Sequence, residues 1–399
     1  MKKIIVLVWL SIIASNIEAQ DTIRNKKNGG YLFKTIASCE STEVQNQNRT
    51  STCWSFSSLS FFESELIRMK KGRHNLSEMF VVRNAYLGKA ETYVRMNGFH
   101  NFGPGGAFHD LPWVIKRYGI VPEEVYKGLN YGYGKHNHAE MDAVLKGIVD
   151  AVKGNPQGKL TTLWKNAFAG AIDAYLGPIP STFTYQGKNY TPMSFSNSLG
   201  LNMDDYVSLT SFTHHPYYSQ FAIEVPDNWA MMQSYNVTLD ELQNAAEKAL
   251  ISGYTWAWGA DVSEKGFSFT NGVAIVPIHD SLITQTGKDN KAFNDAGAKR
   301  TSTAFDSPMT EKNITDTLRQ MAFDNYETTD DHGMHATALM VDQIGNKYFK
   351  IKNSWGTGND CAGYLYCSMN YFRYKTLNIY VHKNALPKEL AKKLGISQN

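Results

Sequence analysis

The stretch QNRTSTCWSFSSLSFFESELIRMKKG, from Gln47 to Gly72, places a cysteine at the start of a helical pattern. From Cys53 onward apolar residues recur every three or four positions as far as Met69, which is typical of an amphipathic helix. A thiol in the first turn lies at the positive end of the helix dipole, which favours its thiolate form. Free cysteine is also among the most buried side chains, so a plain packing role for Cys53 is the alternative.

Length and composition restrict the class of protein. The chain has 399 residues, of which 42% are hydrophobic and 13% aromatic, enough to bury a large core as one domain or two lobes. Charged residues make up 19% and the formal net charge is only +3, which argues against a dedicated nucleic-acid or membrane-surface protein. Because low-complexity tracts and solenoid repeats are absent from the sequence, we expect a compact enzyme or binding protein.

The N-terminus has the pattern of an export signal. Lys2 and Lys3 precede an apolar run from Ile4 to Ala14, and a polar stretch then ends in Ala19. This order predicts a signal peptide over residues 1–19 that is cleaved before Gln20, with a retained anchor as the alternative. The mature protein is therefore expected to be exported, to a periplasm or to the extracellular space.

Export makes the state of the four cysteines relevant, because disulfides form in oxidising compartments. Cys361 and Cys367 would lie roughly 20 Å apart on an extended strand, too far for a bridge without a bend. No C-x-x-C pair supports a zinc site. A mostly reduced set with Cys53 as the functional thiol is the simplest interpretation, and no metal is expected.

The distribution of patterns along the chain predicts an α+β fold. Residues 21–46 are loop-like, helical periodicity dominates from Cys53 to about Gly177, and short strand-like segments dominate after residue 204. One later helix is expected at TLDELQNAAEKALISG, with Thr238 as its N-cap. Helices first and an antiparallel sheet later indicate two lobes with a cleft between them.

A thiol nucleophile needs an imidazole, a group that orients it and an oxyanion donor. His335 begins an apolar strand, and the next strand ends in KNSWG, which contains Asn353 and Trp355. An asparagine carbonyl can accept from one ring nitrogen and leave the other facing the thiol, while an indole shields that bond from water. Gln47, six residues before Cys53, can donate its amide to an oxyanion beside the Cys53 backbone N–H.

The other histidines have weaker sequence contexts. His332 and His335 form an H-x-x-H pair, which could hold a metal on a helical turn. The residues that follow indicate a strand, and no carboxylate completes the zinc-protease pattern. His214 and His215 open a strand-like segment. We therefore select His335 as the candidate base.

The motifs QNRTSTCWSF, HATALMV and KIKNSWG resemble the three active-site blocks of papain-like cysteine peptidases. Three further stretches, GPGGAFHDLPWVIKRYGIVPEEVY, YTPMSFSNSLGLNMDDYVSLTSF and YTWAWGADVSEKGF, resemble bleomycin hydrolase and bacterial aminopeptidase C. Cys53 and His335 are 282 residues apart, against roughly 130–150 in compact papain-like enzymes, so an insertion is expected at about 135–255. The resemblance implies a helical lobe and an antiparallel β-barrel-like lobe within residues 20–385, followed by a tail at 386–399.

The resemblance also implies an activity, removal of N-terminal residues from peptides without a cofactor, and a hexameric assembly. The residues that it implies are Gln47 as oxyanion donor, Cys53 as nucleophile, His335 as general acid and base, Asn353 as the orienting group, and Gly105, Gly106, Trp355 and the terminal carboxylate of Asn399 as substrate-binding groups. In this family the chain terminus enters the cleft and meets the substrate's ammonium, but the ending KKLGISQN differs from the usual one. An open cleft with endopeptidase action is therefore the alternative, followed by another thiol amidase or acyltransferase and by a non-catalytic binding protein.

Overall fold

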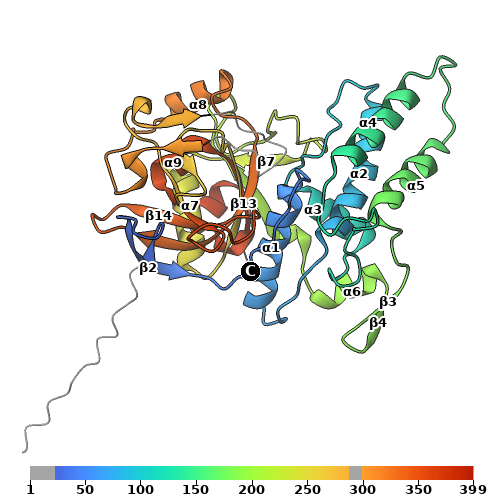
Figure 1. Ribbon diagram of the computed structural model, residues 1–399, viewed down its shortest axis with the longest axis horizontal. Helices are drawn as coiled ribbons and strands as arrows, with labels where there is room; N and C mark the ends of the chain where they lie inside the picture. Colours follow the sequence, from blue (N-terminus) through green and yellow to red (C-terminus); the bar gives the residue numbers. More distant parts are fainter. Residues whose placement is uncertain (1–22, 287–298, 399) are drawn as a thin grey trace, which may run out of the picture.

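The computed structural model describes residues 23–286 and 299–398, which form two lobes (Figure 1). The predicted signal peptide at 1–19 and Asn399 lie outside the described residues. In Figure 1 helices α2 to α6 lie on the right, the large sheet lies on the left together with α7, α8 and α9, and helix α1 lies between them. The predicted α+β, two-lobe architecture is confirmed.

The helical lobe is built from the first half of the chain. Its elements are α1 (Cys53–Arg68), α2 (Glu78–Arg95), α3 (Asp110–Tyr118), α4 (Ala139–Lys153), α5 (Trp164–Leu176), the hairpin β3 (Phe183–Tyr185) and β4 (Lys188–Tyr190), and α6 (Pro192–Leu199). The predicted insertion at about 135–255 begins with α4 to α6 and continues into strands of the main sheet; its boundaries stay a prediction.

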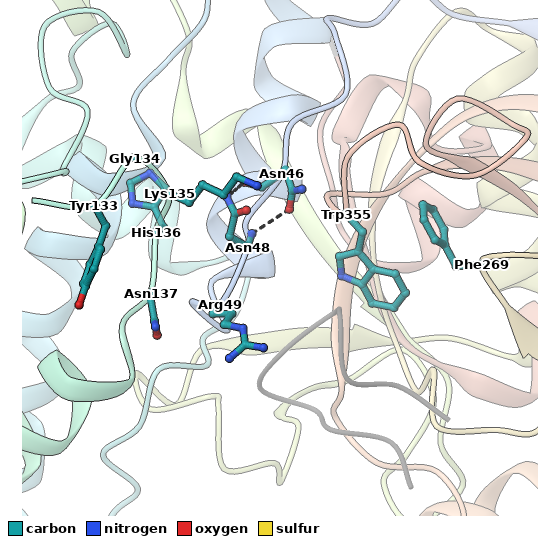
Figure 2. A pocket seen from close by; sticks show the side chains of 10 residues that line it. All are labelled: Asn46, Asn48, Arg49, Tyr133, Gly134, Lys135, His136, Asn137, Phe269 and Trp355. Atoms are coloured by element: carbon teal, nitrogen blue, oxygen red, sulfur yellow. Dashed lines mark hydrogen bonds between the residues drawn. The ribbon is translucent and has the colours of Figure 1, made fainter. Parts of the chain in front are cut away.

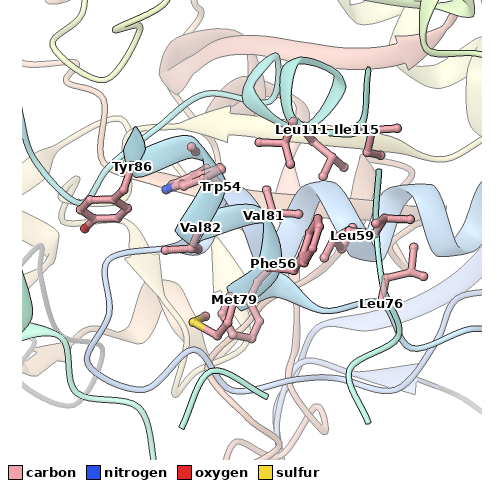
Figure 3. Packing of buried hydrophobic residues seen from close by; sticks show 14 of the residues in the cluster. Trp54, Phe56, Leu59, Leu76, Met79, Val81, Val82, Tyr86, Leu111 and Ile115 are labelled. Carbon is pink, nitrogen blue, oxygen red and sulfur yellow. The ribbon is translucent and has the colours of Figure 1, made fainter. Parts of the chain in front are cut away.

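Helix α1 is the central element of the core. Figure 3 shows Trp54, Phe56 and Leu59 of α1 packed among apolar side chains of α2 and α3. The opposite face of α1 contacts strand β13 of the sheet lobe, so the helix is buried on nearly every side. Full burial explains why its apolar residues are not confined to one stripe. The predicted helix start at Cys53 is confirmed.

The second lobe is a mixed sheet with helices on its surface. Its strands, in spatial order, are β6 (Gln220–Ala222), β7 (Gln233–Asn236), β5 (Tyr206–Thr210), β16 (Thr376–His382), β8 (Trp256–Ala260), β13 (His332–Val341), β14 (Lys347–Lys352), β15 (Tyr364–Ser368), β10 (Val273–Ala274) and β9 (Phe267–Ser268). The remaining elements are the small hairpin β11 (Thr284–Thr286) and β12 (Lys299–Thr301), and the helices α7 (Leu239–Ile251), α8 (Asp316–Asp324), α9 (Met369–Lys375) and α10 (Lys388–Lys393).

The sheet differs from the expected antiparallel one in two places. Strands β10 and β15, and strands β5 and β7, pair in parallel. The N-terminal segment, expected to be loop-like, forms β1 (Ile23–Arg24) and β2 (Leu32–Ser38), and β2 pairs with β13. In β2 every second side chain points outward, and because apolar Ile36 is among the outward ones, the sequence lacks a clean alternation.

A β-bulge interrupts the pairing of β13 with β14. From Val341↔Lys347 the register runs regularly to Ala338↔Lys350, but the next pair is Ala336↔Ile351, so Thr337 has no partner. A bulge of this kind shifts every later pair by one residue. As a result His335 lies opposite Lys352, whereas an unbroken register would have placed it opposite Asn353.

The four cysteines are free thiols, in agreement with the predicted reduced set. Among the described residues, no helix has the length and apolar character needed to cross a membrane.

Candidate active site

The loop from Gln47 to Cys53, which connects the predicted oxyanion donor to the start of α1, is tightly turned. Asn48 and Ser51 have φ values of 53° and 54°, so the chain makes two left-handed turns within five residues. The Thr50 hydroxyl donates to the Gln47 carbonyl at 2.9 Å and closes this loop. The turn shortens the path between Gln47 and Cys53, as the predicted oxyanion role requires.

Gln47 is buried and held across the lobes by Ser354. Its Oε1 atom accepts from Ser354 Oγ at 2.6 Å, and its backbone N–H donates to the Ser354 carbonyl at 2.8 Å. Because the carbonyl end of the amide is occupied, the Nε2 end is the one that can donate to an oxyanion. The orientation suits the predicted role, which stays a prediction.

Cys53 is the first residue of α1 and lines a pocket at the junction of the lobes. Burial raises the pKa of the Cys53 thiol to about 12, while the Gly333 and Trp54 backbone N–H groups lower it and the carboxylates of Asp227 and Asp330 raise it further. The direction is opposite to that expected from the helix dipole alone. Desolvation of the thiolate outweighs the dipole and favours the neutral thiol.

Two histidines, His109 and His332, line the Cys53 pocket, and His332 is the one that contacts Asn353. Its Nε2 atom lies 2.7 Å from Asn353 Oδ1, and an amide oxygen can only accept, so Nε2 carries the proton and Nδ1 is the basic nitrogen. The Trp355 ring lies over the imidazole, with 4.7 Å between ring centroids. Burial lowers the pKa of His332 to about 4, although the Asn353 bond works in the opposite direction.

The prediction that Asn353 orients His335 is wrong. His335 Nδ1 lies 2.9 Å from Ser60 Oγ, on the far side of β13 from the Asn353 amide. Ser60 is seven residues after Cys53, which is about 10 Å along the helix axis. Burial, and then the charge of Lys352, drive the pKa of His335 well below its usual value. His335 is therefore a neutral core residue beside α1.

The bulge at Thr337 explains why His332, and not His335, lies beside Asn353. Residues that pair across antiparallel strands share a face, so His335 lies on the same face as Lys352. Continuing the register beyond that pair puts Asn353 opposite Met334, and residues two apart on a strand share a face. Asn353 consequently lies on the face of His332. The sequence did contain a signal for His332. It is three positions from His335, an odd number, so the two histidines lie on opposite faces of β13.

The loop that carries Gly105 and Gly106 is held in place by Lys89 of α2. The Lys89 ammonium donates to the carbonyls of Gly103, Pro104 and Gly105. A side chain at Gly105 would collide with the Asp227 carboxylate, and the Cβ of a residue at position 106 would come within 2.9 Å of the Trp54 indole. Of the two glycines, Gly106 lines the Cys53 pocket, and Gly105 lies against Asp227 just behind it.

Sequence reasoning missed the acidic groups of this pocket. Asp227, Asp330 and Asp331 line it together with Cys53. Asp227 belongs to the turn after β6, and the other two directly precede β13. The motif DDHG had placed two carboxylates next to His332, and this was the available signal.

A second, more open pocket lies beyond Trp355 (Figure 2). Trp355 lines it on one side and a loop containing Tyr133 and His136 lines it on the other. Two basic residues, Arg49 and Lys135, also line this pocket. Trp355 thus lines the basic pocket and contacts His332 of the acidic Cys53 pocket; its predicted contact with substrate stays a prediction.

The described part of the C-terminal tail is anchored away from the Cys53 pocket. Gln398 Nε2 donates to the carbonyls of Lys383 and Leu386, both at 2.9 Å. Lys383 directly follows β16 and lies five residues after the pocket residue Asn378, a span of about 16 Å for an extended chain. The predicted role of the Asn399 carboxylate falls outside the described residues and stays a prediction.

Comparison with known proteins places this geometry in a family. The model of the Peptidase C1-like family matches residues 182–398, more than half of the chain. The chain belongs to the Peptidase C1-like family. It is therefore a cysteine-type peptidase, in agreement with the resemblance stated from its motifs.

Individual relatives cover nearly the whole chain. Aminopeptidase G of Lactobacillus delbrueckii subsp. lactis is 21% identical, over 92% of this chain and 86% of its own length. Aminopeptidase C of Lactococcus lactis subsp. cremoris is 23% identical, over 87% of this chain and 82% of its own. The crystal structure of PepW from Lactobacillus rhamnosis HN001 superposes with a TM-score of 0.68 at 19% identity, over 91% of this chain and 84% of that one. The structural likeness confirms the papain-like fold.

Proposed function

We propose that this protein is a cysteine aminopeptidase that uses Cys53 as nucleophile and His332 as general acid and base. The observation that carries the proposal is the pocket that Cys53 and His332 share, with His332 Nε2 bonded to Asn353 at 2.7 Å. That bond leaves Nδ1 as the proton acceptor. The Trp355 ring shields the bond between His332 and Asn353 from water. Asn353 is a positioning residue, since it acts through the imidazole.

The first half of the reaction is acylation. The Cys53 thiol transfers its proton to His332 Nδ1 as the sulfur attacks the scissile carbonyl carbon. Gln47 Nε2 and the Cys53 backbone N–H donate to the resulting oxyanion. His332 then passes the proton to the leaving nitrogen as the C–N bond breaks, which leaves a thioester on Cys53 and a free amine.

Deacylation reverses the roles. His332 takes a proton from water while the water oxygen attacks the thioester carbon, and the C–S bond then breaks. The proton returns from His332 to the Cys53 sulfur, and the carboxylic acid product leaves. Burial shifts the pKa of both groups toward their neutral forms, which suits a mechanism in which His332 accepts the thiol proton during attack.

The charges on the two sides of His332 support action at a free N-terminus. His332 protonates the leaving nitrogen, so the leaving peptide lies on the Trp355 side, where Arg49 and Lys135 line the basic pocket. The retained residue lies on the other side, in the pocket of Asp227 and Asp330. A carboxylate there attracts an α-ammonium. The relatives named as aminopeptidases support the same orientation of the substrate, with its N-terminus in the acidic pocket.

Export and assembly are separate parts of the proposal. The N-terminal pattern of charged and apolar residues supports export to a periplasm or the extracellular space. Peptides or proteins are the proposed substrates, and a homo-oligomer is proposed only from the family.

The test compares a fluorogenic aminoacyl amide that has a free α-amine with its N-acetylated twin. Recombinant protein starting at Gln20 is assayed beside Cys53→Ala and His332→Gln. We expect cleavage of the free-amine substrate only, with loss of activity in both variants.

Two results would redirect the assignment. Efficient cleavage of N-acetylated peptides would show an open cleft and endopeptidase action. Amide or acyl transfer to added amines, without net peptide hydrolysis, would assign the same thiol to a transferase.

A further inference from the structure

A cluster of two imidazoles and one carboxylate lies outside the Cys53 pocket. His214 Nε2 lies 3.1 Å from Glu224 Oε2, and His215 Nε2 lies 2.9 Å from Glu224 Oε1. One ligand-type atom from each residue lies within 4.8 Å of the other two. His214 and His215, from one loop, thus face the Glu224 carboxylate from another loop. Each imidazole contacts a different carboxylate oxygen.

Aromatic packing fixes both rings in this arrangement. The His215 ring stacks on Phe221 of β6, with 4.2 Å between centroids and an interplanar angle of 24°. The His214 ring stacks on Phe323 of α8 at 5.8 Å, also at 24°, and contacts Phe221 by its edge. Because the rings cannot rotate freely, their Nε2 atoms stay directed toward Glu224.

Gln320 supports the outer nitrogen of His214 in either tautomer. His214 Nδ1 lies 3.0 Å from Gln320 Nε2 and 3.2 Å from Gln320 Oε1. The amide orientation is fixed, since its oxygen accepts from the Thr213 backbone N–H at 2.6 Å and its nitrogen donates to Asp324 at 2.8 Å. A histidine that binds metal through Nε2 needs an acceptor for its Nδ1–H, and Gln320 Oε1 is placed to accept it.

We propose that His214, His215 and Glu224 form a zinc-binding site next to the Cys53 pocket, on the segment whose residues Ile223 and Val225 line that pocket. Two imidazoles and a carboxylate are a donor set that zinc takes in proteins, with a fourth position for water. The ligand atoms lie within 4.8 Å of one another, and those around tetrahedral zinc lie about 3.4 Å apart, so each pair closes by at most about 1.4 Å on binding. The side chains are 29%, 35% and 53% exposed, which gives a hydrated ion access.

The place of Glu224 in the chain connects this site with the pocket. Its neighbours on both sides, Ile223 and Val225, line the Cys53 pocket, and so does Asp227. A metal that fixes Glu224 restrains the segment whose flanking side chains form that wall. Zinc at this site therefore stabilises the conformation of the acidic side of the pocket and takes no part in the thiol chemistry.

The experiment measures zinc binding in a Cys53→Ala background, which removes the competing thiol beside His332. Isothermal titration with Zn²⁺ is run on this parent and on versions that also carry His215→Gln, Glu224→Gln or Gln320→Ala. An exposed histidine elsewhere, in the His279→Gln version, is the matched control. Cobalt(II) replaces zinc in a parallel titration, because its visible absorption reports tetrahedral nitrogen and oxygen ligands.

We expect one zinc per chain in the parent and in the His279→Gln control, and a rise in the melting temperature on binding. Binding is expected to be lost with His215→Gln and Glu224→Gln, and to weaken about tenfold or more with Gln320→Ala. Melting temperatures without metal show whether each variant folds. Equal zinc affinity in the folded parent and the folded ligand variants, or no binding to the parent, would overturn the proposal.

Discussion

Replacing each of the two histidines of β13 in turn tests the assignment of the base. His332→Gln removes the nitrogen that moves a proton to and from Cys53 in the proposed mechanism. General acid and base catalysis contributes about 10²–10⁴-fold, so kcat/KM should fall by that factor. The same change should slow alkylation of Cys53 by iodoacetamide at neutral pH, because no neighbouring base takes up the thiol proton.

His335→Gln should lower the stability of the protein and leave its activity nearly unchanged. The side chain makes one hydrogen bond, at 2.9 Å to Ser60 Oγ, and is completely enclosed beside α1. Loss of a buried partner costs about 1–3 kcal/mol of the free energy of unfolding, so the melting temperature should fall. Because Ser60 lies about 10 Å along the helix from Cys53, kcat/KM per folded molecule should change little.

The assay is initial-rate hydrolysis of a fluorogenic aminoacyl amide, with active sites titrated and melting curves measured for both variants. A large loss of kcat/KM in well-folded His335→Gln, together with near-normal activity in His332→Gln, would refute the assignment. Such a result would also mean that the register of β13 in solution differs from the one described.

Three further changes have defined outcomes. Asn353→Ala removes the 2.7 Å bond to His332, a bond to a group that becomes charged, and should lower kcat/KM about 10–100-fold with little effect on KM. Asp227→Asn should raise KM for free-amine substrates and leave N-acetylated ones unaffected, so the selectivity between the two should shrink in a substrate-pair assay. In a pH profile, kcat/KM should fall as the pH drops through about 4, because His332 must be neutral to accept the thiol proton.

Much of the fold could be predicted because its signals are local. The spacing of apolar residues after Cys53 predicted α1, and the structure begins that helix at the same residue. Thr238 was predicted as an N-cap, and its hydroxyl accepts from the Glu241 backbone N–H in a full capping box. The mixed sheet was harder, since parallel pairs such as β5 with β7 depend on contacts that no short window contains.

The site was predicted only in part, for a specific physical reason. The motifs identified Cys53, Gln47 and Asn353, whose local surroundings the structure describes. The histidine was chosen from its place before an apolar run, without knowledge of the strand register. Thr337 carries no sequence signal for a bulge, yet that bulge decides which histidine shares a face with Asn353. Asp227 was missed because it reaches the pocket through the fold alone.

The lysine beneath the glycine loop has a consequence for heat inactivation. Lys89 is held under the indole of Trp54, 4.9 Å from that ring, and bonded to three loop carbonyls. Helix α2, the start of α1 and the loop are therefore one cooperative unit. Activity should persist on heating until the helical lobe melts as a whole, so the two transitions should coincide. Early loss of activity, typical of enzymes whose substrate loops fray first, is not expected for this peptidase.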